Sequence, residues 1–393
     1  MKIITILLII LAVISCNQHQ ESKTEFVSET LDNKIYKKYN LQNSNAVVLD
    51  AFSESDVVIL GENHFIKEHV LFVADLIPKL YNDSIYTMYS EFTYLVDSLL
   101  VDSLIFADNF DEKLAKELLV RSGWEWQYKE YIELYHSAWT LNSTIKEGRK
   151  FRIIGLELGR DYTAIQKLED WKDTEKRMAY FREYEDDWAN RIISNTINKG
   201  EKALVYCGIY HGLTFYKQPV SNNGIFIRLA GVERMGQYLY QQHKDNCKFI
   251  VFHFPWEQKN NRYEAPVVPL KGKLDQIADR LSEPYKSYGF YTQKSSLAKI
   301  KDTMSYFSYG YPNFSLSSLC DAYLVIKPLC ELNQCEAVPN FIDASNIDIV
   351  RPQVKAWLNI KNISIDSANQ ILSNDYKELT EFFNKNKKSL NCN

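Results

Sequence analysis

Residues 57–64 read VVILGENH, an apolar run that stops at Gly61 and is followed at once by Glu62 and His64. A short continuous apolar run that ends at a turn signal predicts a buried strand, here 56–60. Similar runs recur between stretches with helical spacing, at Ile85–Ser90, Phe151–Leu156, Ala203–Cys207, Ile225–Leu229 and Phe249–Phe254. This alternation predicts an α/β fold with a central, mainly parallel sheet that helices cover on both faces.

The connecting stretches predict the helices and the division of the chain. We expect helices over 69–80, 94–147 (a helical insert) and 161–200. The pattern loosens from about residue 270, with helices expected at 275–281, 354–360 and 376–384 and a strand at 323–326. We therefore expect an α/β domain over 33–265 and a less regular C-terminal extension, 266–393, that packs on the same domain.

The N-terminus predicts a lipoprotein signal peptide, residues 1–15. One lysine precedes the apolar run 3–14, which is too short to cross a bilayer as a mature helix. Residues 13–15 match a lipobox before Cys16, so we expect acyl chains such as palmitate on Cys16, although a plain secretory signal could also contain a cysteine there. Residues 16–32 are polar and predict a tether. The expected location is the cell envelope, with the outer membrane as the commoner destination.

Charge and cysteine content narrow the partners and the compartment. With 46 basic and 50 acidic residues the formal net charge is −4, which gives no reason to expect nucleic acid as a partner. An exported protein meets an oxidising environment. Cys320, Cys330, Cys335 and Cys392 predict two disulfides, with three possible pairings. Cys207, inside an apolar run, predicts a buried free thiol.

Five groups that can act as acid, base or ligand follow the expected strands. They are Glu62, His64, Glu91, Glu157 and His211. Because ligands bind at the carboxyl ends of parallel strands, these groups are expected to converge in one pocket although they span 150 residues. Both histidines have the form Gly-x-x-His, with Gly61 and Gly208, and a glycine lets the chain turn sharply off a strand.

A purely structural role for these groups stays open. Glu62 could cap the following helix, where carboxylates are favoured, and Glu157 could pair with Arg152 or Arg160. Distance decides between the chemical alternatives. Zinc or manganese would need the ring nitrogens of His64 and His211 within about 5 Å of each other, and histidines more than about 12 Å apart could not act on one substrate.

Residues 55–257 resemble a superfamily that joins erythromycin esterase-like proteins, ChaN-like haem-uptake lipoproteins and Tiki/TraB-type proteases. The run 57–64 looks like the Gly-Glu-x-His opening of the ChaN-like branch. Residues 124–157 are similar to the helical insert and third strand of the esterase branch, with glutamate where aspartate is usual. Residues 187–212 are similar to the helix and the Gly-x-x-His strand that the Tiki branch shares, and 231–240 to the Met-Gly segment of the esterases.

Each branch implies a different chemistry. The esterase branch implies a histidine that activates water, oriented by carboxylates. The Tiki branch implies a divalent metal, which here would be zinc or manganese held by His64, His211, Glu62 and Glu91. The ChaN-like branch implies haem binding without catalysis. The convergent carboxylates and imidazoles favour hydrolysis of an ester or amide bond in a small-molecule or peptide substrate, and a haem- or ligand-binding lipoprotein is the alternative.

Overall fold

The computed structural model describes residues 31–222, 225–259, 265–390 and 392. The expected signal peptide, Cys16 and most of the expected tether lie outside the described residues. Residues 31–39 are helical and lead into the first strand. Within the described ranges, no helix combines the length and the apolar composition needed to cross a membrane.

The central sheet has eight strands in the order β1-β9-β10-β8-β2-β5-β3-β4. The six strands from β10 to β4 run parallel, whereas β9 is antiparallel to β10 and β1 to β9. The strands are β1 (Gln42–Asn43), β2 (Val57–Glu62), β3 (Thr87–Tyr94), β4 (Arg152–Glu157), β5 (Ala203–Gly208), β8 (Cys247–Phe252), β9 (Tyr288–Tyr291) and β10 (Ala322–Val325). The predicted α/β class with a mainly parallel sheet is confirmed.

One predicted sheet strand is wrong. Residues Ile225–Leu229 form β7, which pairs only with β6 (Pro219–Asn222) in a separate antiparallel hairpin. The side chains of Ile225 and Ile227 are 71% and 58% exposed, so this apolar run does not mark a buried strand. The sheet is completed instead by β9 and β10, which come from the chain after residue 265.

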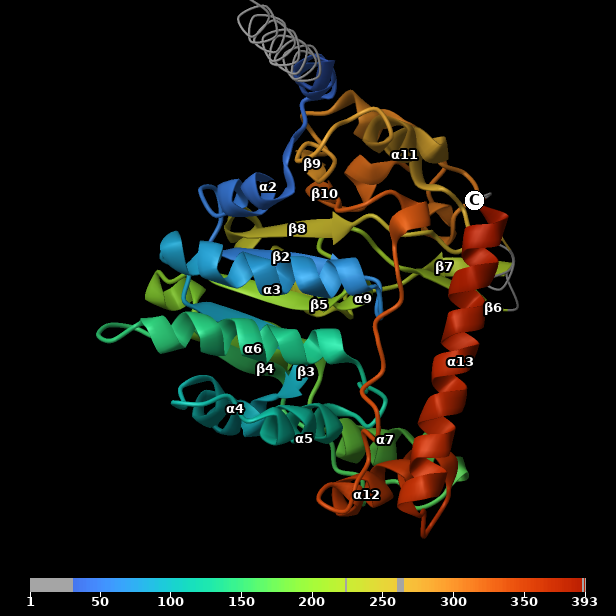
Figure 1. The fold of residues 1–393 in the computed structure, drawn as a ribbon. Coiled ribbons are helices and arrows are strands. Elements are labelled where there is room, and N and C mark those ends of the chain that lie inside the picture. Colours follow the sequence, from blue (N-terminus) through green and yellow to red (C-terminus); the bar gives the residue numbers. More distant parts are fainter. Residues whose placement is uncertain (1–30, 223–224, 260–264, 391, 393) are drawn as a thin grey trace, which may run out of the picture.

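Helices cover both faces of the sheet (Figure 1). The buried side chains along β2 alternate, with Val58 and Leu60 in one apolar cluster and Val57 and Ile59 in the other. The first cluster includes α2 (Ser44–Ala51), α3 (Lys67–Asn82), α4 (Ser98–Ile105), α5 (Glu112–Ser122), α6 (Lys129–Thr144) and α12 (Ile347–Leu358). The second includes α8 (Glu185–Asn195), α10 (Met235–His243) and α11 (Lys273–Ala278). The expected helical stretch 94–147 is thus three helices with loops between them.

The last helix, α13 (Ile365–Ser389), is far longer than the predicted 376–384. It runs along the side of the molecule where the parallel strands end (Figure 1). A disulfide joins Cys330 to Cys392, just beyond the helix. The expected second disulfide is wrong, because Cys320 and Cys335 are fully buried free thiols that belong to opposite apolar clusters.

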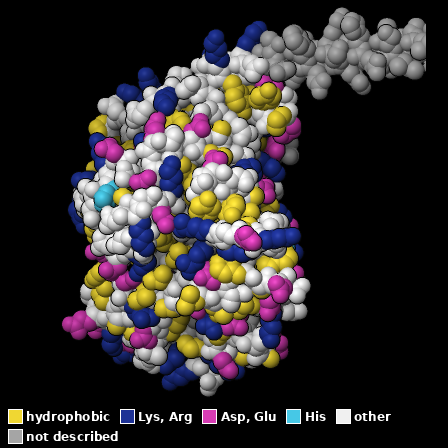
Figure 2. Space-filling view, turned by 90° about the vertical axis from the view of Figure 1, so that its left-hand side faces the viewer, with side chains coloured by type: hydrophobic (Ala, Val, Ile, Leu, Met, Phe, Trp, Pro, Cys, Tyr) yellow, Lys and Arg dark blue, Asp and Glu magenta, His cyan; other side chains and the backbone are white. Residues whose placement is uncertain are grey.

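The opposite side of the molecule, where the strands begin, carries interspersed basic, acidic and apolar side chains (Figure 2). Neither sign of charge dominates that face.

Candidate functional site

Glu62 is the last residue of β2, and its side chain is fully buried. Two tyrosine hydroxyls donate to it: that of Tyr131 on α6, 2.7 Å from Oε1, and that of Tyr206 on β5, to Oε2. Burial and then the charge of Glu62 raise the pKa of both tyrosines well above its usual value, so both keep the proton that they donate. A buried carboxylate needs such partners, and these hold Glu62 in one position.

His64 lies two residues further on, in the loop before α3. Its Nδ1 is 2.9 Å from Glu62 Oε1. Because a carboxylate only accepts, the proton of the neutral imidazole sits on Nδ1 and Nε2 keeps its lone pair. Burial would lower the pKa of His64, but the hydrogen bond with Glu62 and the charge of Glu91 raise it above the usual value. The side chain is 34% exposed, so a solute can reach it.

The backbone around His64 fixes the orientation of the ring. Phe65, the next residue, has a φ of 67°, a conformation that L side chains rarely adopt and that persists only where neighbours enforce it. Its carbonyl accepts from the N–H of Cys335 at 2.9 Å. On its other side the imidazole lies against Gly208, where a Cβ atom would come within 2.7 Å of Cε1 and Nε2. The glycine of the second Gly-x-x-His motif thus makes room for the histidine of the first.

Glu91 connects the two histidines. It lies within β3, at an irregularity in the pairing with β4, and not after the strand as the sequence suggested. Its Oε1 is 4.0 Å from His64 Nε2 and 3.3 Å from His211 Nε2, while the N–H of Gly208 donates to Oε2 at 2.6 Å. The two Nε2 atoms are therefore separated by no more than the sum of the first two distances, well under about 12 Å. The structure brings both histidines to one place.

His211 lies in the short helix α9 (Ile209–Gly212) that follows β5, between two carboxylates. Its Nδ1 is 3.1 Å from Glu185 Oε1, opposite the contact with Glu91. Glu185 also contacts Arg234 at 2.8 Å. Glu185 begins α8 as the first of three successive acidic residues and is not among the site residues predicted from the sequence. Acidic residues are common at helix N-termini, so nothing in the sequence distinguished it.

The charges of this cluster depend on one another. Burial would lower the pKa of His211, but the charges of Glu91 and Glu185 raise it well above the usual value. Burial would raise the pKa of Glu91, but the charge of His211 and its hydrogen bond hold it well below the usual range. The pKa of Glu185 is lowered for the same reason. At neutral pH His211 is therefore an imidazolium between two carboxylates.

Glu157, the last residue of β4, reaches the same pocket as Glu91 and His211. Both of its oxygens contact Arg160, at 3.0 and 3.3 Å. This is the ion pair that the sequence left open as a structural alternative, and Arg152 pairs with Asp102 instead. Glu157 thus lines the pocket of His211, but both of its oxygens are paired with Arg160.

Two pockets flank the histidines and differ in chemistry. The pocket on the His211 side has a volume of about 530 Å³ and is lined by Glu91, Glu157, Arg160, Met178, Phe181, Glu183, Tyr184, Glu185, Trp188, Glu233, Arg234 and Tyr238 besides the histidine. The pocket on the His64 side, about 300 Å³, is lined mainly by aromatic and aliphatic side chains and bounded by α13. Trp126 and Phe92 stand edge-on to the His64 ring.

The same geometry bears on metal ligation. In the described part of the chain, no group of three or more His, Cys, Asp or Glu side chains is arranged to hold a metal ion. The Nδ1 atoms of His64 and His211 face Glu62 and Glu185, and the Oε1 atom of Glu91 is 3.3 Å or more from both Nε2 atoms. The residues as placed do not fit a metal centre, and the chemistry below uses the side chains themselves.

No protein-family model matches this chain, and no curated protein sequence gives a significant match. Among solved structures, it is similar to a succinoglycan biosynthesis protein, with 12% identity and a TM-score of 0.49 over 77% of this chain and 97% of that one. It is also similar to a mutant of the erythromycin esterase EreC in its open conformation, with 14% identity and a TM-score of 0.46 over 74% of this chain and 93% of that one. A third similar structure is ChaN of Campylobacter jejuni with cofacial haem, with 12% identity and a TM-score of 0.35 over 56% of this chain and 93% of that one. Such likeness concerns the fold, and sites on one fold differ in function.

Proposed function

We propose that this protein hydrolyses ester or amide bonds, with His64 as the base that activates water. The observation that carries the proposal is the difference between two imidazoles that share Glu91. His211 has a carboxylate within 3.3 Å of each ring nitrogen, whereas His64 has one only at Nδ1 and its Nε2 lies 4.0 Å from Glu91. In enzymes, a pair of titratable groups whose surroundings push their pKa values apart often divides the work. One group acts as the base and the other stays charged.

In the first step the Nε2 lone pair of His64 takes a proton from a water molecule while the water oxygen bonds to the substrate carbonyl carbon. The negative charge of Glu62 stabilises the imidazolium that forms, and the two tyrosines keep Glu62 in place. The carbonyl electrons move to the oxygen, and the resulting oxyanion is stabilised by the positive charge of His211.

In the second step the oxyanion collapses and the bond to the leaving oxygen or nitrogen breaks. The leaving group takes the proton that His64 holds, which returns the imidazole to its neutral form. One water molecule is consumed, and a carboxylic acid and an alcohol or amine are released. Glu91 keeps His211 charged and oriented throughout, so Glu91 and Glu185 are positioning residues.

The decisive experiment compares His64→Ala with His136→Ala on whichever substrate a screen of esters and peptides identifies. His136 is a matched control, because it is 45% exposed on the surface of α6 and its nearest acidic partner is Glu133. Loss of the base should lower kcat about 10²–10⁴-fold with an unchanged melting temperature, and the control should keep its activity. Full activity in His64→Ala would overturn the proposal.

A second candidate is haem binding without catalysis. It is supported by His64 itself, which donates from Nδ1 to Glu62, lines a mainly apolar pocket and would offer the lone pair of Nε2 to haem iron. Absorbance titration with haem tests it. A Soret shift at micromolar haem that disappears in His64→Ala supports this candidate, and the absence of any shift removes it.

A further inference from the structure

We propose that the pocket on the His64 side is a subsite for an unbranched aliphatic chain, so that the substrates are esters or amides of medium-chain acids. The catalytic part of this statement rests on the proposed hydrolysis. The binding part concerns the pocket alone and can be tested without any reaction.

The walls of the pocket are mainly apolar and come from several parts of the chain. The carboxyl end of β8 supplies Phe254 and α9 supplies Ile209, while Phe307 and Leu332 come from the loops of the C-terminal part. The facing wall is α13, with Leu379 and Phe383. His64 is itself a lining residue, so an acyl chain in this pocket lies beside the proposed base.

The contrast between the two pockets indicates which part of a substrate lies in each. Five glutamates and two arginines line the pocket on the His211 side. Among the lining residues on the His64 side, Lys387 and Glu257 carry charge and most of the others are hydrophobic. A substrate that spans both is an amphiphile, with its apolar arm beside His64. Phe382 of α13 lines this pocket and is 44% exposed. The apolar arm of a bound substrate would cover that ring and remove it from water.

The volume sets the length of the chain. A pocket of about 300 Å³ lies at the small end of the range for small-ligand sites, which suits a chain of medium length rather than a long one. Each buried methylene contributes about 0.8 kcal/mol, which is about fourfold in affinity. Affinity should therefore rise steeply with chain length and then level off.

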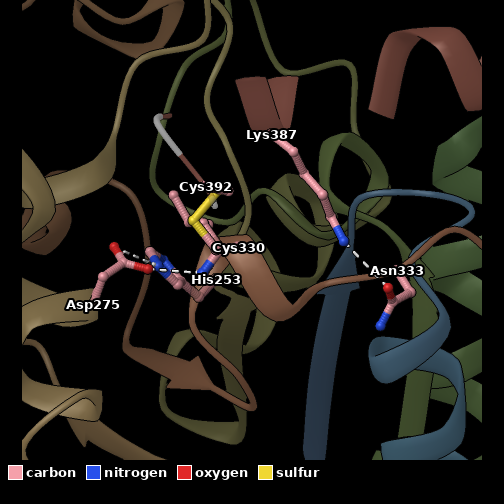
Figure 3. The surroundings of a disulfide bond; sticks show 7 residues. His253, Asp275, Cys330, Asn333, Lys387 and Cys392 are labelled. Carbon is pink, nitrogen blue, oxygen red and sulfur yellow. Dashed lines mark hydrogen bonds and ion pairs between the residues drawn. A yellow bond between two sulfur atoms is a disulfide. The ribbon is translucent and has the colours of Figure 1, made fainter. Parts of the chain in front are cut away.

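The α13 wall is held in place by covalent and polar contacts. The Cys330–Cys392 disulfide ties the end of the helix to the loop that supplies Leu332, and Lys387 contacts Asn333 at 3.2 Å (Figure 3). The hydroxyl of Thr380 donates to Gln334 at 2.8 Å. A preformed pocket binds an apolar chain without a large cost of ordering.

The test measures binding of the methyl ketones from 2-pentanone to 2-nonanone to the folded protein by isothermal titration calorimetry. These probes carry a carbonyl but no bond that the site could hydrolyse. Each added methylene should tighten binding by about fourfold. Leu379→Trp and Asn386→Trp place an indole in the pocket and should weaken binding of 2-nonanone at least tenfold, whereas Lys377→Trp, at an exposed position on the same helix, should leave it unchanged.

The outcomes separate this inference from the proposed hydrolysis. Absence of chain-length dependence in the wild-type protein would overturn the subsite even if both pocket variants failed to fold, and so would unchanged binding in a folded Leu379→Trp. Ketone binding without hydrolysis of any ester supports the subsite and counts against the hydrolase. Hydrolysis of acetyl esters in preference to octanoyl esters, without ketone binding, overturns the subsite and leaves the hydrolase standing.

Discussion

At the scale of single residues, the site depends on two histidines with opposite protonation. His64 must be neutral to accept a proton, and its pKa is raised above the usual value of about 6.5. His211 must be charged, and its pKa is raised much further. Activity should therefore rise with pH as His64 loses its proton, above about pH 6.5, and fall at higher pH as His211 loses its own. The measurement is the pH dependence of kcat/KM.

The variant Glu62→Gln tests whether the acid limb of the pH profile belongs to His64. The amide oxygen can still accept from one of the two tyrosines, and the amide NH2 can donate to the hydroxyl oxygen of the other. The amide has no charge to stabilise an imidazolium, so the pKa of His64 falls. The acid limb should then move to lower pH and kcat should decrease, while the alkaline limb stays in place. An acid limb that did not move would assign it to a group other than His64.

Gly208 offers a second test at this scale. A Cβ atom at this position would lie 2.7 Å from two atoms of the His64 ring, so Gly208→Ala should turn the imidazole away from Glu62. We expect a loss of activity of about 10²-fold, the effect of misplacing a catalytic group, and only a small change in melting temperature. In Gly231→Ala the added atom would be 4.0 Å from its nearest neighbour, which makes it the matched control. Equal activities in the two variants would contradict the role of Gly208.

At the scale of elements, the disulfide is the test of how α13 is attached. Cys330 and Cys392 are 62 residues apart in sequence, and removing a bridge of this kind lowers the free energy of unfolding by roughly 2–4 kcal/mol. Cys392→Ser should show this loss in chemical denaturation. Dithiothreitol should destabilise the wild-type protein to the same extent and have no further effect on Cys392→Ser. Equal stability of the oxidised and reduced wild-type proteins would contradict the expectation.

The same elements show what the sequence could predict. Apolar runs located β2, β3, β4, β5 and β8 because a strand buried on both faces is apolar throughout, and β7 was misplaced because an exposed hairpin can look the same. The ends of these strands led to Glu62, His64, Glu91 and His211. Tyr131, Tyr206 and Glu185 were beyond reach, since they approach the site across the fold from sequences without a distinctive pattern. The cysteine pairing also required the sheet, which separates Cys320 from Cys335.

At the scale of the whole molecule, the parallel strands direct every candidate group to one side, and α13 bounds the apolar pocket there (Figure 1). The opposite side carries acidic, basic and apolar side chains interspersed with one another (Figure 2). The amphiphilic substrates that we propose partition to lipid surfaces, which agrees with the membrane anchor proposed below.

The membrane anchor gives the last prediction. We propose that the mature protein starts at Cys16 and carries several acyl chains, because one chain holds a protein only weakly and several hold it stably. The wild-type protein should then fractionate with membranes and incorporate labelled palmitate. Cys16→Ala should abolish the label and release the protein from the membrane fraction, whereas Cys247→Ala, at a buried free thiol in β8, should change neither. Membrane association that survives in Cys16→Ala would mean that residues 1–15 act as an uncleaved anchor or that the folded domain binds lipid directly. Carbonate extraction and the mass of the mature N-terminus distinguish these two outcomes.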